Sequence, residues 1–254
     1  LELPRVLELL SEQAVSAEAK QRALRIRPKT EPEEVLRLLD QTDAARNLIG
    51  LRGSPSFSGV KPVAASLQRA HMGGALNTRE LLDIAAVLRA ARSAREYGEG
   101  DERKKTCIDH LFRSLTANRF LEDKITGSIV GEDEIADAAS PELASIRRHI
   151  RATASKVRDI LNKLLSSNQA KYLQEAIITQ RNDRFVVPVK SEHKNDVPGL
   201  VHDVSSSGAT FFIEPMGVVK ANNELKELQA REEKEIERIL AELSAECAQF
   251  KDDI

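Results

Sequence analysis

Residues 140–165 read SPELASIRRHIRATASKVRDILNKLL, and this stretch decides the fold. Ser140 suits a helix N-cap and Pro141 suits the first helical position. Apolar side chains then recur three, four, seven, three and four residues apart, at Leu143, Ile146, Ile150, Val157, Ile160 and Leu164, and Thr153 fills the gap. A narrow apolar seam of this length needs a partner helix rather than a flat core. We therefore expect an ascending lever helix over residues 140–175, about 45 Å long or longer.

A second seam of the same kind follows in residues 217–254. Its apolar members are Leu225, Leu228, Ile236, Ile239, Leu243, Cys247 and Phe250. Residues 142–174 carry seven basic and two acidic side chains, net +5, whereas residues 217–254 carry six basic and ten acidic ones, net −4. Because opposite charges on the flanks favour pairing, we expect the second segment to be a descending lever helix beside the first, cut short at residue 254.

The segment between the two seams, residues 176–216, changes from helical to β character. Four apolar runs predict strands: Ala176–Thr179, Phe185–Val189, Gly199–Val204 and Thr210–Ile213. Asn182 and Asp183 tolerate positive φ and predict a tight turn, and Ser205–Gly208 predicts another. Pro188 has no N–H group, which favours an edge strand or a bulge. We expect a small antiparallel β-sheet at the far end of the helical hairpin.

Residues 1–139 are expected to form a helical core domain. Capping boxes at Thr30/Glu33 and Asn77/Glu80 predict two helix starts, and residues 97–101 predict an exposed loop. Ile125–Val130 and Glu134–Asp137 flank Gly131 and predict a short hairpin. The fold class is thus mainly α: a helical core domain and a long antiparallel helical hairpin, tipped by a small antiparallel β-sheet.

Composition limits the function. The chain has 254 residues and is 41% hydrophobic, enough to bury a core, and its net charge of −2 excludes a uniformly basic nucleic-acid binder. Cys107 and Cys247 have neither zinc-ligand spacing nor a disulfide pattern, as expected for thiols of a reducing compartment. Because no apolar run approaches the roughly 20 residues of a membrane span and no signal pattern is present, we expect a cytoplasmic protein that does not bind membranes.

Several long strings resemble one known family, the bacterial MutS-two family, a paralogue of the mismatch-repair MutS ATPases that carries a C-terminal Smr domain. The strings are RNDRFVVPVK at 181–190, GLVHDVSSSGAT at 199–210, FIEP at 212–215, NNEL at 222–225, LELP at 1–4 and SPEL at 140–143. The resemblance covers essentially the whole chain. It implies the core, lever and clamp region of a family member, with residues 176–216 as the clamp.

The resemblance also implies a parent protein that works as an ATP-driven homodimer, with its ATPase and Smr nuclease domains downstream. Family members have been assigned branched-DNA binding with restraint of recombination, and splitting of stalled, collided ribosomes. The chain has no G-x-x-x-x-G-K-[ST] motif and no acidic cluster for a metal nuclease. We therefore expect no catalytic residue, no metal site and no cofactor in the chain, whereas ATP and Mg belong to the parent. The sequence leaves open whether the target is DNA or the ribosome, and what the oligomeric state of the chain is.

Polar residues of the clamp are the first candidates for nucleic-acid contact. They are Arg181, Asn182, Arg184, Lys190, Lys194, Ser206 and Ser207. Such groups position a phosphate backbone and read no bases. Because six acids outnumber four bases between residues 175 and 216, an ordinary solvated surface is the alternative. His202, Asp203 and Ser205 invite a catalytic-triad interpretation, which we set aside because neighbours on a strand point to opposite faces.

A second candidate surface is a basic stripe on the ascending helix, formed by Arg147, Arg148, Arg151 and Arg158. These arginines either face a nucleic-acid channel or pair with the acidic descending helix, and we favour the pairing. The sequence thus predicts a non-catalytic module that grips branched or double-stranded DNA, a ribosome, or both. A structural coiled-coil scaffold that binds only proteins is the alternative, and a nuclease is a third hypothesis.

Overall fold

The computed structural model describes residues 2–99 and 105–254. The chain divides into two compact units, one formed by residues 1–136 with 239–254 and the other by residues 137–238. As predicted, the fold is mainly helical, and it carries two small antiparallel sheets. No helix among the described residues is long and apolar enough to span a membrane.

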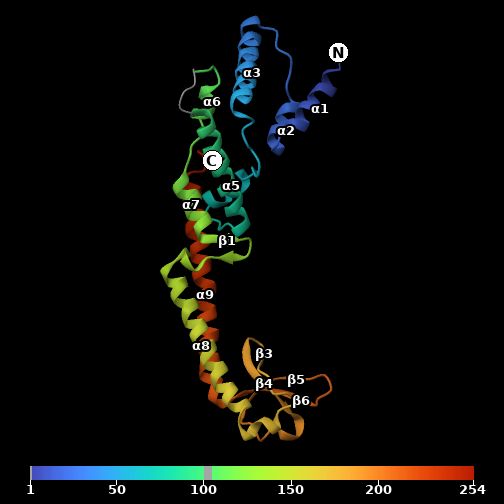
Figure 1. The fold of residues 1–254 in the computed structure, drawn as a ribbon, viewed down its shortest axis with the longest axis vertical. Helices are drawn as coiled ribbons and strands as arrows, with labels where there is room; N and C mark the ends of the chain where they lie inside the picture. Colours follow the sequence, from blue (N-terminus) through green and yellow to red (C-terminus); the bar gives the residue numbers. More distant parts are fainter. Residues whose placement is uncertain (1, 100–104) are drawn as a thin grey trace. The chain divides into compact units, whose positions relative to one another are not determined.

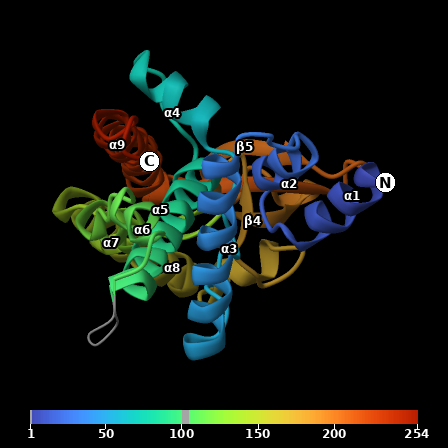
Figure 2. The same cartoon turned by 90° about the horizontal axis from the view of Figure 1, so that it is seen from above.

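The first unit contains seven helices before its small hairpin within the described residues. They are α1 (Leu3–Gln13), α2 (Ala17–Leu24), α3 (Pro32–Arg52), α4 (Ala64–His71), α5 (Thr78–Glu99), α6 (Asp109–Arg113) and α7 (Arg119–Ser128). Figure 2 shows α5, α6 and α7 gathered together. Leu81, Ile84 and Leu121 are fully buried there. Leu243 and Cys247, from the end of helix α9 (Met216–Gln249), are buried in the same unit.

Of three local sequence predictions for the first unit, one is confirmed and two are wrong. The Asn77/Glu80 capping box is confirmed, since Asn77 Oδ1 accepts from the Glu80 N–H at 2.9 Å and Glu80 Oε2 accepts from the Asn77 N–H at 3.0 Å. The Thr30/Glu33 box is wrong: α3 begins at Pro32 with Glu31 at the N-cap, because proline at the first turn presets the helical φ. The 97–101 loop is wrong over residues 97–99, which continue α5, while residues 100 and 101 lie outside the described residues.

The predicted hairpin around Gly131 forms, but it is shorter. Strand β1 (Ile129–Gly131) pairs with β2 (Glu134–Ile135), and residues 125–128 belong to α7 instead. The short 3₁₀ turn η1 (Asp137–Ala139) then leads into the second unit.

Helix α8 (Pro141–Leu165) begins as the sequence predicts. Ser140 Oγ accepts from the Leu143 N–H at 2.9 Å, and Pro141 occupies the first turn. The helix has 25 residues rather than the more than 30 expected. It ends at Ser166–Ser167, where the hydroxyls bond to carbonyls of the last turn, and the 3₁₀ turn η2 (Asn168–Tyr172) follows.

Within the second unit, α8 and the first part of α9 run antiparallel (Figure 1). Arg147 Nε lies 2.6 Å from Glu232 and Glu142 lies 2.7 Å from Arg231, while Val157 and Leu161 share a core with Val218 and Leu225. The apolar seam of α8 is confirmed at Leu143, Ile146, Thr153 and Val157. Ile150, Ile160 and Leu164 are only partly buried, and Leu161 takes a buried place that the seam did not include.

The same unit contains a four-stranded antiparallel sheet in the order β3-β4-β6-β5. Its strands are β3 (Thr179–Arg181), β4 (Arg184–Lys190), β5 (Gly199–Val204) and β6 (Thr210–Pro215), and a 3₁₀ turn, η3 (Ser191–His193), follows β4. The Asn182–Asp183 turn is confirmed, with φ of 50° and 61°. Val187, Val189 and Ile213 pack one face of the sheet on α8 and α9.

Pro188 lies in the central strand β4, not at an edge. Its carbonyl accepts from the Gln174 N–H at 2.9 Å, so this residue directs its backbone polar groups away from β6. On that side β3 pairs only with residues 184–186 of β4. The missing N–H group therefore removes no bond from the sheet ladder.

Candidate nucleic-acid interface

The β3–β4 turn holds two of the candidate contact residues. Arg181 Nε donates to Asp203 Oδ2 at 3.1 Å, and its guanidinium lies 4.0 Å from the centre of the Phe212 ring. Asn182 Nδ2 donates to the His202 carbonyl at 3.2 Å. Both contacts join the turn to β5, at the opposite edge of the sheet order. The sheet therefore curls so that β3 approaches β5 over its second face, the one opposite Val187, Val189 and Ile213. These contacts hold the turn in place.

Arg184 points into that second face rather than to solvent. Its Nη1 donates to both oxygens of Glu214, at 2.9 and 3.0 Å, and its Nη2 donates to Asn223 Oδ1 at 2.6 Å. Glu214 is completely buried and also contacts His202 Nε2 at 2.5 Å. A buried carboxylate requires neutralising partners. Arg184 therefore stabilises the buried Glu214 carboxylate inside the sheet.

Asn222, the first asparagine of the NNEL string, connects this cluster to α9. Its amide accepts from the Phe185 N–H at 3.3 Å, donates to the Phe185 carbonyl at 3.0 Å and donates to Glu214 at 2.8 Å. Asn222 is completely buried. We call Arg184, His202, Glu214 and Asn222 the buried polar cluster. It ties β4, β5 and β6 to the first turns of α9.

The remaining candidates on the sheet lie nearer solvent. Lys190 Nζ donates to the Lys171 carbonyl at 3.2 Å, and Lys194 Nζ lies 4.8 Å from the centre of the Phe211 ring. Ser206 and Ser207 are exposed in the β5–β6 turn. Lys190 pairs with Thr210 across β4 and β6, and the Ser191 N–H donates to the Ala209 carbonyl, so Lys190 lies at the same end of the sheet as the β5–β6 turn.

The triad interpretation finds no support in the geometry. His202 faces Glu214, Asp203 faces Arg181, and the Ser205 hydroxyl accepts from the Thr210 N–H at 3.1 Å. The described residues contain no group of three or more side chains able to hold a metal ion. Burial raises the pKa of the Cys247 thiol to about 12, which keeps it protonated and unreactive.

Helix α8 divides its arginines between two environments. Arg147 bonds Glu232 at 2.6 Å and Asp137 at 2.7 Å, and Arg151 reaches Asp137 at 3.3 Å. Arg147, followed by Arg151, lowers the pKa of Asp137 below its ordinary value. The sequence favoured pairing of these arginines with the descending helix. Arg147 makes such a contact, whereas Arg151 pairs with the turn before α8.

The other exposed cations of α8 have no carboxylate partner within the described residues. Arg148, Lys156 and Lys163 make no ion pair among the residues that the structure describes, and the Arg158 guanidinium lies 5.5 Å from the centre of the Phe185 ring. Arg148, Lys156 and Lys163 are eight and seven residues apart, so they follow one side of the helix. We call these three residues the α8 cation row. Sequence reasoning counted Lys156 and Lys163 in the net charge but did not propose them as contacts, although their spacing was visible.

Comparison with known proteins adds an independent finding. No family model matches the chain. It is 45% identical to a protein named Endonuclease MutS2 from Ruminiclostridium cellulolyticum over 251 residues, which are 98% of this chain and 32% of that protein. Proteins of the same name from Acetivibrio thermocellus and Alkaliphilus metalliredigens are each 43% identical, over 100% and 98% of this chain and 32% of their own length. The chain thus spans about a third of the length of these relatives.

Proposed function

Since the chain belongs, over the region that it spans, to the family of proteins named Endonuclease MutS2, we propose that it is the nucleic-acid-gripping module of a MutS-like ATPase. Residues 1–139 are its core, 140–175 and 217–254 its lever, and 176–216 its clamp. The parent protein hydrolyses ATP with Mg, cleaves through its Smr domain and acts as a homodimer. The target is branched DNA, a stalled and collided ribosome, or both.

The α8 cation row is the observation that carries this proposal. Three exposed cations that form no ion pair with the described residues face solvent along one side of a regular helix, and a phosphate backbone is the polyanion that such a row suits. Arg181 supports it, because its side chain is 38% exposed although Asp203 neutralises part of its charge.

The test is salt-dependent binding of the chain to a four-way DNA junction, to double-stranded DNA and to ribosomes. We expect binding at low salt that weakens steeply as salt rises, since each phosphate contact contributes about 0.9 to the slope of log K against log salt. Replacing Lys156→Glu and Lys163→Glu together should weaken binding by about tenfold or more and flatten that slope. The matched control is Lys226→Glu with Lys234→Glu, two exposed lysines of α9.

The alternative, a scaffold that binds only protein, rests on a different observation. Arg147, Arg151 and Arg184 are all engaged with carboxylates of the same unit. Absence of binding to all three targets at low salt would favour the scaffold. Equal loss of binding in the α9 control would show that total charge, and not the cation row, governs the interaction. Preference for the junction or for ribosomes in the same titration would identify the target.

A further inference from the structure

An open apolar groove lies in the first unit between α3 and the region of α6. Its volume is about 1210 Å³. Leu38 on α3, Phe57 after α3, and Leu111 and Phe112 on α6 line its floor. Leu111 is 53% exposed, Phe57 43% and Leu38 39%, so the floor is apolar surface open to water. A contiguous apolar patch of this kind marks an interaction site.

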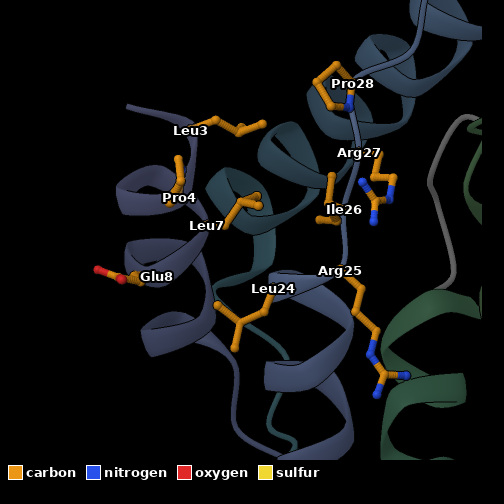
Figure 3. A pocket seen from close by; sticks show the side chains of 9 residues that line it. All are labelled: Leu3, Pro4, Leu7, Glu8, Leu24, Arg25, Ile26, Arg27 and Pro28. Carbon is orange, nitrogen blue, oxygen red and sulfur yellow. The ribbon is translucent and has the colours of Figure 1, made fainter. Parts of the chain in front are cut away.

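One rim of the groove is basic. Residues 24–28 alternate apolar and charged, and in Figure 3 Leu24 and Ile26 point toward α1 whereas Arg25 and Arg27 point away from it. On the α1 side, a smaller hollow of about 590 Å³ is lined by Leu24 and Ile26 and also by Arg25 and Arg27. Arg22, Arg25 and Arg27 line the α3–α6 groove.

Those three arginines have no carboxylate partner in the part of the chain that the structure describes. Within residues 2–99 and 105–254 none of them forms an ion pair, whereas the neighbouring Lys29 pairs with Glu34 at 2.9 Å. A groove with an apolar floor and unpaired cations on one side is complementary to a ligand with an apolar face and an acidic flank. Nucleic acid does not fit this description, because its phosphates would leave the leucine and phenylalanine floor uncovered.

The size of the groove indicates the kind of ligand. A helix about 10 Å across with a rise of 1.5 Å per residue occupies roughly 120 Å³ per residue, so the groove accommodates about ten residues, or three turns. A helix laid in a groove contributes apolar side chains at i, i+3, i+4 and i+7. We propose that the α3–α6 groove docks an amphipathic helix with an acidic flank, supplied by a partner protein.

The experiment uses the 254-residue chain and a fluorescein-labelled synthetic helix of about 18 residues, with leucine at i, i+3, i+4 and i+7 and glutamate on one flank. A second peptide carries lysine in place of each glutamate. We expect the acidic peptide to bind and the basic one to bind at least about fivefold more weakly by fluorescence anisotropy. Arg25→Glu with Arg27→Glu should invert this preference. The matched control is Lys20→Glu with Arg37→Glu, exposed cations of α2 and α3 that do not line the groove.

Leu111→Ser tests the floor and should weaken both peptides alike. Several outcomes would overturn the proposal: no binding, equal binding of the two peptides, or a preference unchanged in the Arg25/Arg27 variant. Self-association of the chain that blocks binding of the acidic peptide would assign the groove to a second copy. If a parent-length protein fails to bind the peptide, its own remaining length fills the groove and the partner assignment is wrong.

Discussion

The four-stranded sheet and helix α8 use their cations in opposite ways. In the sheet, Arg184 turns inward to a buried carboxylate and Arg181 is shared with Asp203. On α8, Arg148 and Lys156 remain exposed without a carboxylate partner in the described chain. Basic residues of the RNDRF string therefore build the sheet, whereas an unremarkable stretch of helix offers free positive charge. A basic residue in a distinctive motif is not by itself a ligand contact.

The largest expected effect concerns the four-stranded sheet, where Arg184 turns inward. Glu214→Ala removes the acceptor shared by Arg184, His202 and Asn222, and leaves the partly buried Arg184 guanidinium without its carboxylate. Breaking one side of a buried ion pair costs about 3–5 kcal/mol. Urea unfolding followed by circular dichroism should show a loss of this size, whereas Asp203→Ala, which removes an exposed acid of the same sheet, should cost less than about 1 kcal/mol. Similar small losses for both variants would mean that the cluster does not hold the sheet together.

Acid pH tests the helical pair. Arg238, followed by Ser140, lowers the pKa of Glu235 to about 2. Because this folded-state pKa lies below the ordinary value, the charged carboxylate stabilises the fold at pH values above the ordinary pKa, and this contribution is lost as the pH falls toward 2. The shift is worth about 2 kcal/mol once the exposure of Arg238 is allowed for.

Urea unfolding at about pH 6 and pH 3 measures the size of that contribution. Glu235→Gln should lose less stability on acidification than the unchanged chain. An equal loss in both would place the acid sensitivity at other carboxylates. Glu235 is the buried acid of the helical pair, as Glu214 is that of the sheet. The result therefore compares how much a buried carboxylate stabilises each of the two regions.

A smaller effect separates the two kinds of arginine on α8. Arg147→Ala removes contacts to Glu232 and Asp137 and should cost about 1–2 kcal/mol of unfolding free energy. Arg148→Ala, one residue further on, should change it by less than about 0.5 kcal/mol, since surface substitutions without partners are near neutral. For DNA binding the order should reverse, with Arg148→Ala the weaker binder. If Arg147→Ala weakens binding more while leaving stability unchanged, the assignment of the two arginines is inverted.

The strand and helix pattern was predictable from the sequence where local chemistry decides it. The Ser140–Pro141 start of α8, the Asn182–Asp183 turn and the strands of residues 184–215 follow from capping, positive φ and apolar runs. The end of α8 and the start of α3 were not, because the Ser166 and Ser167 hydroxyls bond the carbonyls of the last turn of α8 and Pro32 presets the first turn of α3. Propensity and pattern are weaker than a single capping or ring constraint at a helix end.

The candidate site was less predictable, and the reason is also physical. Glu214, His202 and Asn222 are eight to twenty residues apart, and only the pairing of β5 with β6 and the packing of α9 bring them together. No local pattern shows that Arg184 will turn toward the buried Glu214. The spacing of Arg148, Lys156 and Lys163 was readable on a helix, but their lack of partners depended on where the acids of α9 and Asp137 lie.

The smallest expected effect concerns Arg181, a sheet cation that is still partly exposed. Asp203→Asn keeps an oxygen that can accept from Arg181 but removes the negative charge 3.1 Å from its guanidinium. If Arg181 contacts phosphate, the variant should bind DNA about two- to threefold more tightly, because an exposed pair of this kind contributes well under about 1 kcal/mol. Asp183→Asn removes an exposed acid from the adjacent turn and serves as the control for net charge. Equally tighter DNA binding by both variants would mean that Arg181 contributes only to the overall charge of the sheet. Unchanged binding by both would leave α8 as the sole contact surface of the two regions.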